Sequence, residues 1–277
     1  MKFWICSAHL FVLFLTISSA SAQQKTDWKE DNLKGMVMGI NEISYAVTNG
    51  DTFHRKPHSF AFRIFNRRGF LLHDSAGIYD WGMDDRYDYF YDGDRLLKEE
   101  TYSKGQTRPS IDMYRYDSLG NRSFKLKYYR DSTSDGGERY LYDSHRRMTV
   151  LEDYNGKGQL EWRYVYRYDS ALRQTTREQY KPDGTLFFYV VTSYDTAGRE
   201  LKVKAYGADH HFSYGTKYIY DDGGNQVESD NCNEQEQVTD AFKTKYIYDS
   251  VGNWILKEEF NKAGILVQFY RRTYRYF

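Results

Sequence analysis

Two stretches, residues 218–225 (YIYDDGGN) and 246–253 (YIYDSVGN), decide the fold of this 277-residue chain. In each stretch, two tyrosines separated by one residue are followed by aspartate and then by a turn that contains glycine. Side chains two residues apart lie on the same face of a β-strand. Aspartate and glycine are typical of tight turns, because one hydrogen-bonds the turn backbone and the other accepts a positive φ. Each stretch therefore predicts a strand that ends in a tight turn.

The Tyr-Asp pair recurs along the chain at a nearly constant interval. Successive copies are separated by 25, 26, 26, 26, 26 and 28 residues. A further aromatic residue and a second turn occur within most intervals, as in residues 180–184 (YKPDG). Each interval therefore predicts a strand, a tight turn, a second strand and a second tight turn. The tyrosines that anchor the repeat are Tyr91, Tyr116, Tyr142, Tyr168, Tyr194, Tyr220 and Tyr248.

The short connections decide the fold class. They leave no room for a crossover helix, so neighbouring strands must run antiparallel. Aromatic residues make up 18% of the chain and it contains only 3 prolines, a composition that favours pleated strands. We therefore predict an all-β fold, a repetitive antiparallel β-meander of roughly sixteen strands. Because open twisted sheets rarely exceed about ten strands without curling, we expect a curled or rolled sheet, and the sequence leaves open whether it closes.

The first 22 residues predict export. Lys2 precedes an apolar run at residues 10–15 (LFVLFL), and residues 20–22 (ASA) form a small-x-small cleavage site. We expect residues 1–22 to be a signal peptide, residues 23–32 to be loose and residues 33–277 to form a single β domain. The mature protein is then periplasmic, on the outer surface or secreted, and no transmembrane segment remains after cleavage.

Composition argues against several classes of function. Lys+Arg and Asp+Glu both total 39, which disfavours a nucleic-acid partner. Signal cleavage leaves Cys232 as the single cysteine, so neither an intramolecular disulfide nor a thiolate zinc site is expected. Histidines are few, and no phosphate-binding glycine loop or nucleophile elbow occurs. We predict no catalytic residue, no metal site and no cofactor, and hence no enzyme.

The pattern Tyr-x-Tyr-Asp-x-x-Gly-Asn resembles the YD repeat of the Rhs-type family. The resemblance covers residues 65–277, and the chain is similar to short secreted members without a toxin domain. In large relatives these repeats build hollow β-shells around toxins or form extracellular adhesion modules, and some are described as sugar-binding. The resemblance implies an exported binding or structural module.

The aromatic residues have two interpretations. The regular anchors fit a core of stacked rings, although tyrosines can also form a platform for sugars. Aromatic residues outside the repeat are better ligand candidates, because the strand pattern does not require them. The candidate ligand-binding residues are Trp81, Trp162, Phe188 and Trp254.

The sequence favours a non-enzymatic binding or structural module of the cell envelope. A glycan and an envelope protein are both candidate partners. The alternative is a component of an Rhs-like toxin or immunity system, or an envelope enzyme whose site carries no familiar motif. Sequence alone leaves these alternatives open.

Overall fold

The computed structural model describes residues 26–47, 57–79 and 82–277. The predicted signal peptide 1–22 and the candidate Trp81 lie outside these described residues. Within them the chain forms one short helix, α1 (Asp27–Glu30), and eighteen strands. The strands are β1 (Val37–Ala46), β2 (Pro57–Phe65), β3 (Leu71–Ile78), β4 (Met83–Asp92), β5 (Arg95–Ser103), β6 (Ser110–Tyr116), β7 (Arg122–Tyr128), β8 (Ser134–Tyr142), β9 (Met148–Tyr154), β10 (Leu160–Asp169), β11 (Gln174–Tyr180), β12 (Leu186–Tyr194), β13 (Glu200–Gly207), β14 (Phe212–Tyr220), β15 (Gln226–Cys232), β16 (Val238–Tyr248), β17 (Trp254–Phe260) and β18 (Leu266–Tyr276).

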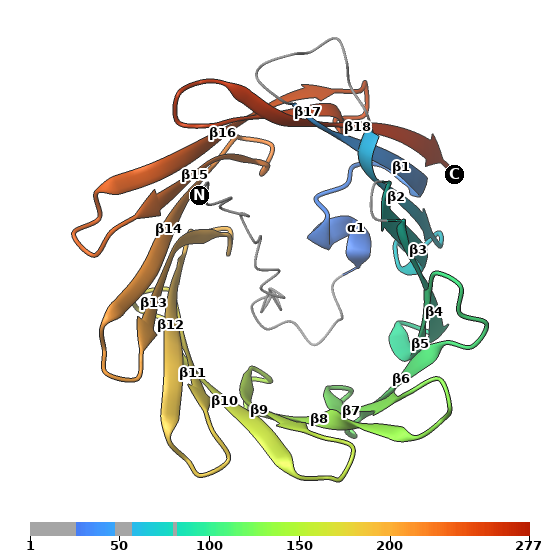
Figure 1. Cartoon of the computed structure of the whole chain (residues 1–277), viewed down its shortest axis with the longest axis vertical. Coiled ribbons are helices and arrows are strands. Elements are labelled where there is room, and N and C mark those ends of the chain that lie inside the picture. The colour runs from blue at the N-terminus through green and yellow to red at the C-terminus, as the bar shows by residue number, and fades with distance from the viewer. Residues whose placement is uncertain (1–25, 48–56, 80–81) are drawn as a thin grey trace, which may run out of the picture.

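The strands form one closed antiparallel barrel. Each strand pairs with its neighbours in sequence, and β1 pairs with both β2 and β18. The β1–β18 ladder runs from the pair Val37–Tyr276 to the pair Ala46–Gln268. Figure 1 shows the resulting ring, with the first and last strands side by side.

The all-β antiparallel meander is confirmed, but the count of about sixteen strands and the curled or rolled sheet are wrong. The described residues contain eighteen strands, and the sheet closes on itself. Closure has a physical reason, because the two ends of an open sheet would present unpaired backbone N–H and C=O groups. Pairing β1 with β18 satisfies those groups and leaves no edge strand in the described sheet.

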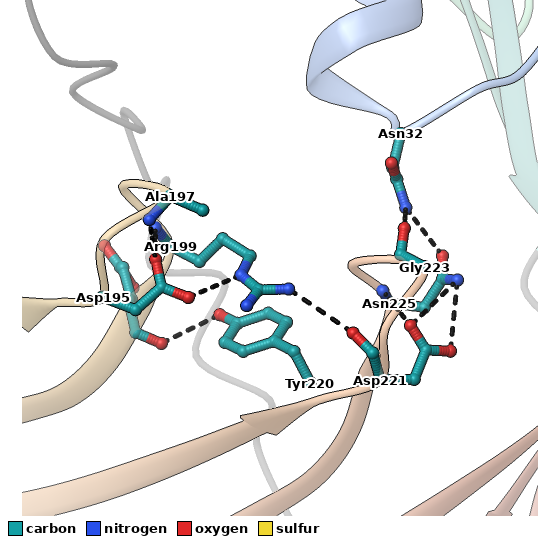
Figure 2. Close-up of polar contacts among 9 residues, drawn as sticks. Asn32, Asp195, Ala197, Arg199, Tyr220, Asp221, Gly223 and Asn225 are labelled. Carbon is teal, nitrogen blue, oxygen red and sulfur yellow. Dashed lines mark hydrogen bonds and ion pairs between the residues drawn. The ribbon is translucent and has the colours of Figure 1, made fainter.

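The aspartate of the Tyr-Asp pair organises the turns at one end of the barrel. Oδ1 of Asp195 accepts the backbone N–H groups of Ala197 and Arg199, both at 2.8 Å. Its Oδ2 lies 2.6 Å from Nε of Arg199 (Figure 2). Because strand direction alternates, these turns share one end of the barrel, here called the Asp rim. Its turns include residues 117–121, 143–147, 195–199, 221–225 and 249–253.

The tyrosines next to these turns link neighbouring strands. The hydroxyl of Tyr220 donates to the carbonyl oxygen of Glu200 at 2.9 Å, and the Arg199 guanidinium lies over the Tyr220 ring at 4.7 Å (Figure 2). Tyr168 repeats the arrangement, with its hydroxyl 2.7 Å from the carbonyl oxygen of Met148. The repeat therefore copies a local hydrogen-bonding unit as well as a strand length.

The described part of the segment predicted to be loose, residues 26–32, is held inside the barrel. Figure 1 shows α1 within the ring of strands. The Trp28 indole N–H donates to the carbonyl oxygen of Val37 at 2.9 Å, and Asp31 forms a 3.0 Å ion pair with Arg63. Asn32 donates to the carbonyl oxygen of Gly223 at 2.9 Å (Figure 2). We call residues 26–34 the inner segment.

These contacts identify the two faces of the sheet. Arg63 contacts the inner segment, so its side chain marks the inner face of β2. Directly paired residues in an antiparallel ladder share a face, and residues two apart on a strand do too. Following the registers around the ring assigns each paired position to the inner or the outer face. Inner-face residues Val37, Ile40 and Phe65 pack with Trp28 and Leu33 in one of several small cores.

Candidate functional site

The repeat tyrosines lie on the inner face, where most are built into the packing. Tyr114, Tyr140 and Tyr166 are buried, with exposures of 7%, 6% and 4%. Burial raises the pKa of Tyr166 to about 12. The hydroxyl of Tyr114 donates to Glu99 at 3.0 Å, and that of Tyr140 donates to Glu138. These rings and hydroxyls are engaged within the protein. The seven anchors Tyr91, Tyr116, Tyr142, Tyr168, Tyr194, Tyr220 and Tyr248 lie on this face, toward the Asp rim.

The described candidate ligand residues also face the interior. Trp254 is half-buried, and the Arg272 guanidinium covers its ring at 3.8 Å. Phe188 packs against the small core around Val190. Trp162 lies opposite Asp153, and its ring is 5.3 Å from that of Phe187. The structure therefore does not bring Trp162, Phe188 and Trp254 into a common cluster.

A different group of side chains converges on the outer face, across β12 to β14 and the turns that follow β13 and β15. Neighbouring aromatic and basic side chains gather there near the end opposite the Asp rim. We call this group the outer patch. Its members are Lys202, Lys204, Lys217, Glu236, Tyr189, Tyr206, His210 and Phe212.

The aromatic half of the outer patch is centred on two stacked rings. Tyr189 of β12 and Tyr206 of β13 are directly paired, with ring centroids 4.8 Å apart and planes 12° from parallel. The His210 ring packs edge-on against Tyr189 at 5.6 Å, and Phe212 packs edge-on against Tyr206 at 5.8 Å. Nδ1 of His210 lies 3.3 Å from the Tyr189 hydroxyl. The result is a half-buried aromatic cluster on the outer face, with the exposed His210 at its margin.

The basic half consists of three lysines around one carboxylate. Oε1 of Glu236 lies 2.8 Å from Nζ of Lys202 and 2.7 Å from Nζ of Lys204. Its Oε2 lies 3.2 Å from Nζ of Lys217. Lys204 is two residues from Tyr206 on the same strand, so the two halves adjoin on one face.

The electrostatics follow from these contacts. Hydrogen bonds from Lys202, Lys204 and Lys217 hold the pKa of Glu236 well below its usual range. The hydrogen bond to Glu236 raises the pKa of Lys204 in turn. The carboxylate is therefore ionised and the Lys204 ammonium charged at neutral pH. Together the four groups leave a net positive charge beside the aromatic cluster.

In two turns that border the outer patch, a residue other than glycine occupies a position with positive φ. At this end of the barrel, Gly158, Gly184 and Gly264 have positive φ at the fourth turn position. The turns at residues 207–211 and 233–237 instead place His210 and Glu236 there, with φ of 64° and 62°. Non-glycine residues adopt this conformation at a cost, and such strain often marks functional sites. Both side chains contact the outer patch.

Sequence reasoning did not identify the outer patch. Tyr189 is adjacent to the predicted Phe188, but consecutive strand residues point to opposite faces. The signal that could have found the site was the missing glycine at positions 210 and 236 of otherwise regular turns. That signal predicts unusual turns but not the strands that their side chains contact.

The described ranges contain no cluster of three or more His, Cys, Asp or Glu side chains placed to hold a metal ion. No helix in the described part of the chain is long and apolar enough to cross a membrane. The buried Cys232 is a free thiol.

No family model matches the sequence, and no curated protein matches it. Among solved structures, a porin-like protein from Bacteroides uniformis is similar at 10% identity and a TM-score of 0.48, over 86% of this chain and 96% of that one. A porin-like protein from Bacteroides vulgatus is similar at 12% identity and a TM-score of 0.39, over 86% and 98%. The TcdB2-TccC3 structure without its hypervariable C-terminal region is similar at 9% identity and a TM-score of 0.29, over 81% and 15%.

The prediction that the chain is a short secreted member of the YD-repeat family is wrong. No family model matches, and the described strands close into a single barrel instead of building a YD-repeat shell. The error has a physical reason. The interval between Tyr-Asp pairs equals the length of two strands and their two turns. The aspartate recurs because it closes the turn, as at Asp143 and Asp195. Any meander of equal strands with such turns repeats this pattern.

Proposed function

We propose that the protein is a non-enzymatic, exported module of the cell envelope that binds carbohydrate through the outer patch. The observation that carries the proposal is the stack of Tyr189 and Tyr206 on the outer face, beside Lys202 and Lys204. Ligand sites commonly combine aromatic surface with a few placed polar groups. Sugar C–H groups would contact the rings, while lysine and histidine nitrogens would hydrogen-bond the hydroxyls.

Charged positions on the outer face support a location in water, and exposed apolar side chains such as Phe90, Met113 and Ile247 lie among them. Charged side chains stand at paired positions along the strands, including the Arg167–Glu178 ion pair at 3.0 Å. A barrel embedded in lipid presents an apolar band on this face. The further charged positions include Lys98, Glu100, Arg139, Glu152, Lys202, Lys217, Glu228, Lys245, Glu258 and Arg271.

The side chains of the inner face already contact other protein groups, which supports the choice of the outer patch as the ligand site. Its tyrosine hydroxyls already donate to protein acceptors, as at Tyr114 and Tyr220. Trp254 is covered by Arg272. A ligand at these inner positions would have to replace existing contacts inside the barrel, whereas Tyr189 and Tyr206 lie on its outer face.

The test is a glycan array probed with the mature chain and with Tyr206→Ala. We expect the variant to bind the recognised glycans about tenfold more weakly, because one ring of the stack is lost. Tyr180→Ala is the matched control, since Tyr180 also lies on the outer face but outside the patch. Equal binding by the wild type and Tyr206→Ala, or no glycan signal at high protein concentration, would overturn the proposal and leave a protein partner as the remaining class.

A further inference from the structure

The contact between Glu236 and the three lysines joins segments that are distant in sequence. Lys202 and Lys204 belong to β13, Lys217 belongs to β14, and Glu236 lies in the turn between β15 and β16. The carboxylate reaches back over two strands to meet all three ammonium groups. Nζ of Lys217 also donates to the Glu236 carbonyl oxygen at 3.5 Å. A turn residue therefore occupies a site that the side chains of two strands form.

The backbone of Glu236 is unfavourable for its residue type. With a φ of 62°, the Glu236 backbone has a left-handed conformation that glycine adopts without strain. Gly158, Gly184 and Gly264 occupy the same position in equivalent turns of the same end. The three lysine contacts oppose this backbone cost. The ion pairs with the lysines therefore offset the backbone strain of Glu236, and their loss would leave that strain uncompensated.

The charges around Glu236 favour an anion at this position. Three ammonium groups against one carboxylate leave a local excess of two positive charges. Asp230 lies on the same face, directly paired with Lys217, and reduces that excess to one. Within the described residues, Oδ1 of Asp230 is buried and has no hydrogen-bond partner. The surroundings therefore keep a net positive charge that favours an anion.

We propose that Glu236 is a tethered internal ligand that occupies an anion-binding site formed by Lys202, Lys204 and Lys217. The external ligand is an acidic saccharide whose carboxylate or sulfate group displaces the Glu236 carboxylate. The saccharide part of this inference rests on the proposed function, whereas the anion site stands by itself. Binding requires the turn at residues 233–237 to move off the lysines, so Glu236 competes with the ligand.

The anion site is tested with inorganic sulfate, titrated calorimetrically into the wild type, Glu236→Gly and Glu236→Gln. Glycine restores the residue of the equivalent turns, and glutamine removes the charge while keeping the side-chain size. If the lysines are free of Glu236 in about a tenth of molecules, both variants should bind sulfate about tenfold more tightly. Ser132→Gly is the matched control, because Ser132 also has positive φ in an equivalent turn but contacts no lysine of the patch.

A second variant secures the interpretation. Adding Lys204→Gln to Glu236→Gln should abolish the gain in sulfate affinity, with folding checked by urea denaturation. Unchanged sulfate affinity in folded Glu236 variants would overturn the anion site and make the cluster structural. A gain in sulfate affinity without binding of any acidic or neutral oligosaccharide would keep the anion site and overturn the saccharide assignment. Binding of neutral oligosaccharides without a sulfate gain would support the proposed function and overturn the anion site.

Discussion

At the scale of single residues, the turn aspartates connect the sequence repeat to stability. One carboxylate oxygen of Asp195 closes the turn by accepting two backbone N–H groups, and the other meets the Arg199 guanidinium. The hydrogen bonds are local, within four residues, and the same closure recurs at Asp117, Asp143, Asp221 and Asp249. This locality explains why the repeat is so visible in the sequence.

We expect Asp195→Ala to lower the free energy of unfolding by about 1–2 kcal/mol, because two turn N–H groups lose their acceptor. Asp195→Asn should cost less, since the amide oxygen still accepts these hydrogen bonds. Urea denaturation measures both values. Asp222→Ala, at an exposed turn position, is the control and should stay within about 0.5 kcal/mol of the wild type. Equal losses for Asp222→Ala and Asp195→Ala would contradict this role.

The same carboxylate predicts a pH dependence. Desolvation alone would raise the pKa of Asp195, but hydrogen bonds from the Arg199 backbone and guanidinium lower it below 3.8. The unfolded state then binds more protons, so this stabilisation is complete above the unfolded pKa and is lost as the pH falls through the folded pKa. The stability difference between wild type and Asp195→Asn should shrink between about pH 5 and pH 2. A constant difference across urea titrations in that range would refute the assignment.

At the scale of elements, the inner segment is fastened to the Asp rim by asparagines. Asn253 is 3% exposed and makes a reciprocal pair with Lys34. Its Oδ1 accepts the Lys34 N–H, and its Nδ2 donates to the Lys34 carbonyl oxygen, both at 2.8 Å. Nδ2 also donates to the Tyr276 hydroxyl at 2.9 Å. One side chain thereby joins the inner segment, a turn and the last strand.

We expect Asn253→Ala to lower the free energy of unfolding by about 2–3 kcal/mol, because it leaves both backbone groups of Lys34 without this partner. The inner segment should also become more susceptible to limited proteolysis within residues 26–34. Asn225→Ala is the control at the neighbouring turn, where Asn225 meets Asn32 through side chains alone. Equal proteolysis rates for the wild type and Asn253→Ala would show that other contacts hold the segment.

At the scale of the whole molecule, closure makes the two chain ends interdependent. Deleting residues 250–277 removes β17 and β18 and leaves β1 and β16 as open edges. We expect far-ultraviolet circular dichroism and size-exclusion chromatography to show loss of the native barrel, since β1 and β16 each lose one of their two partner strands. Deleting residues 23–32 is the control, because it removes no strand pair and should leave a folded, less stable ring. A folded, monomeric product of the 250–277 deletion would contradict closure as a cooperative constraint.

The sequence by itself determined the strands, their antiparallel order and their turns. These features depend on alternation, on glycine and on aspartates whose partners lie within four residues, as Asp195 shows. It did not determine closure, because the pairing of Val37 with Tyr276 depends on curvature accumulated over all the strands. Nor did it determine which face is inside, since alternation defines two faces without distinguishing them.

The candidate site was decided by tertiary structure for the same reason. The contact of Glu236 with Lys202 spans 34 residues, and strand register alone brings Tyr189 against Tyr206. The predicted Trp254 and Phe188 were recognisable as departures from the repeat, but only the closed barrel placed them inside. The turn hydrogen bonds can be predicted from short stretches of sequence. A surface that several strands share depends on their register and on closure of the barrel.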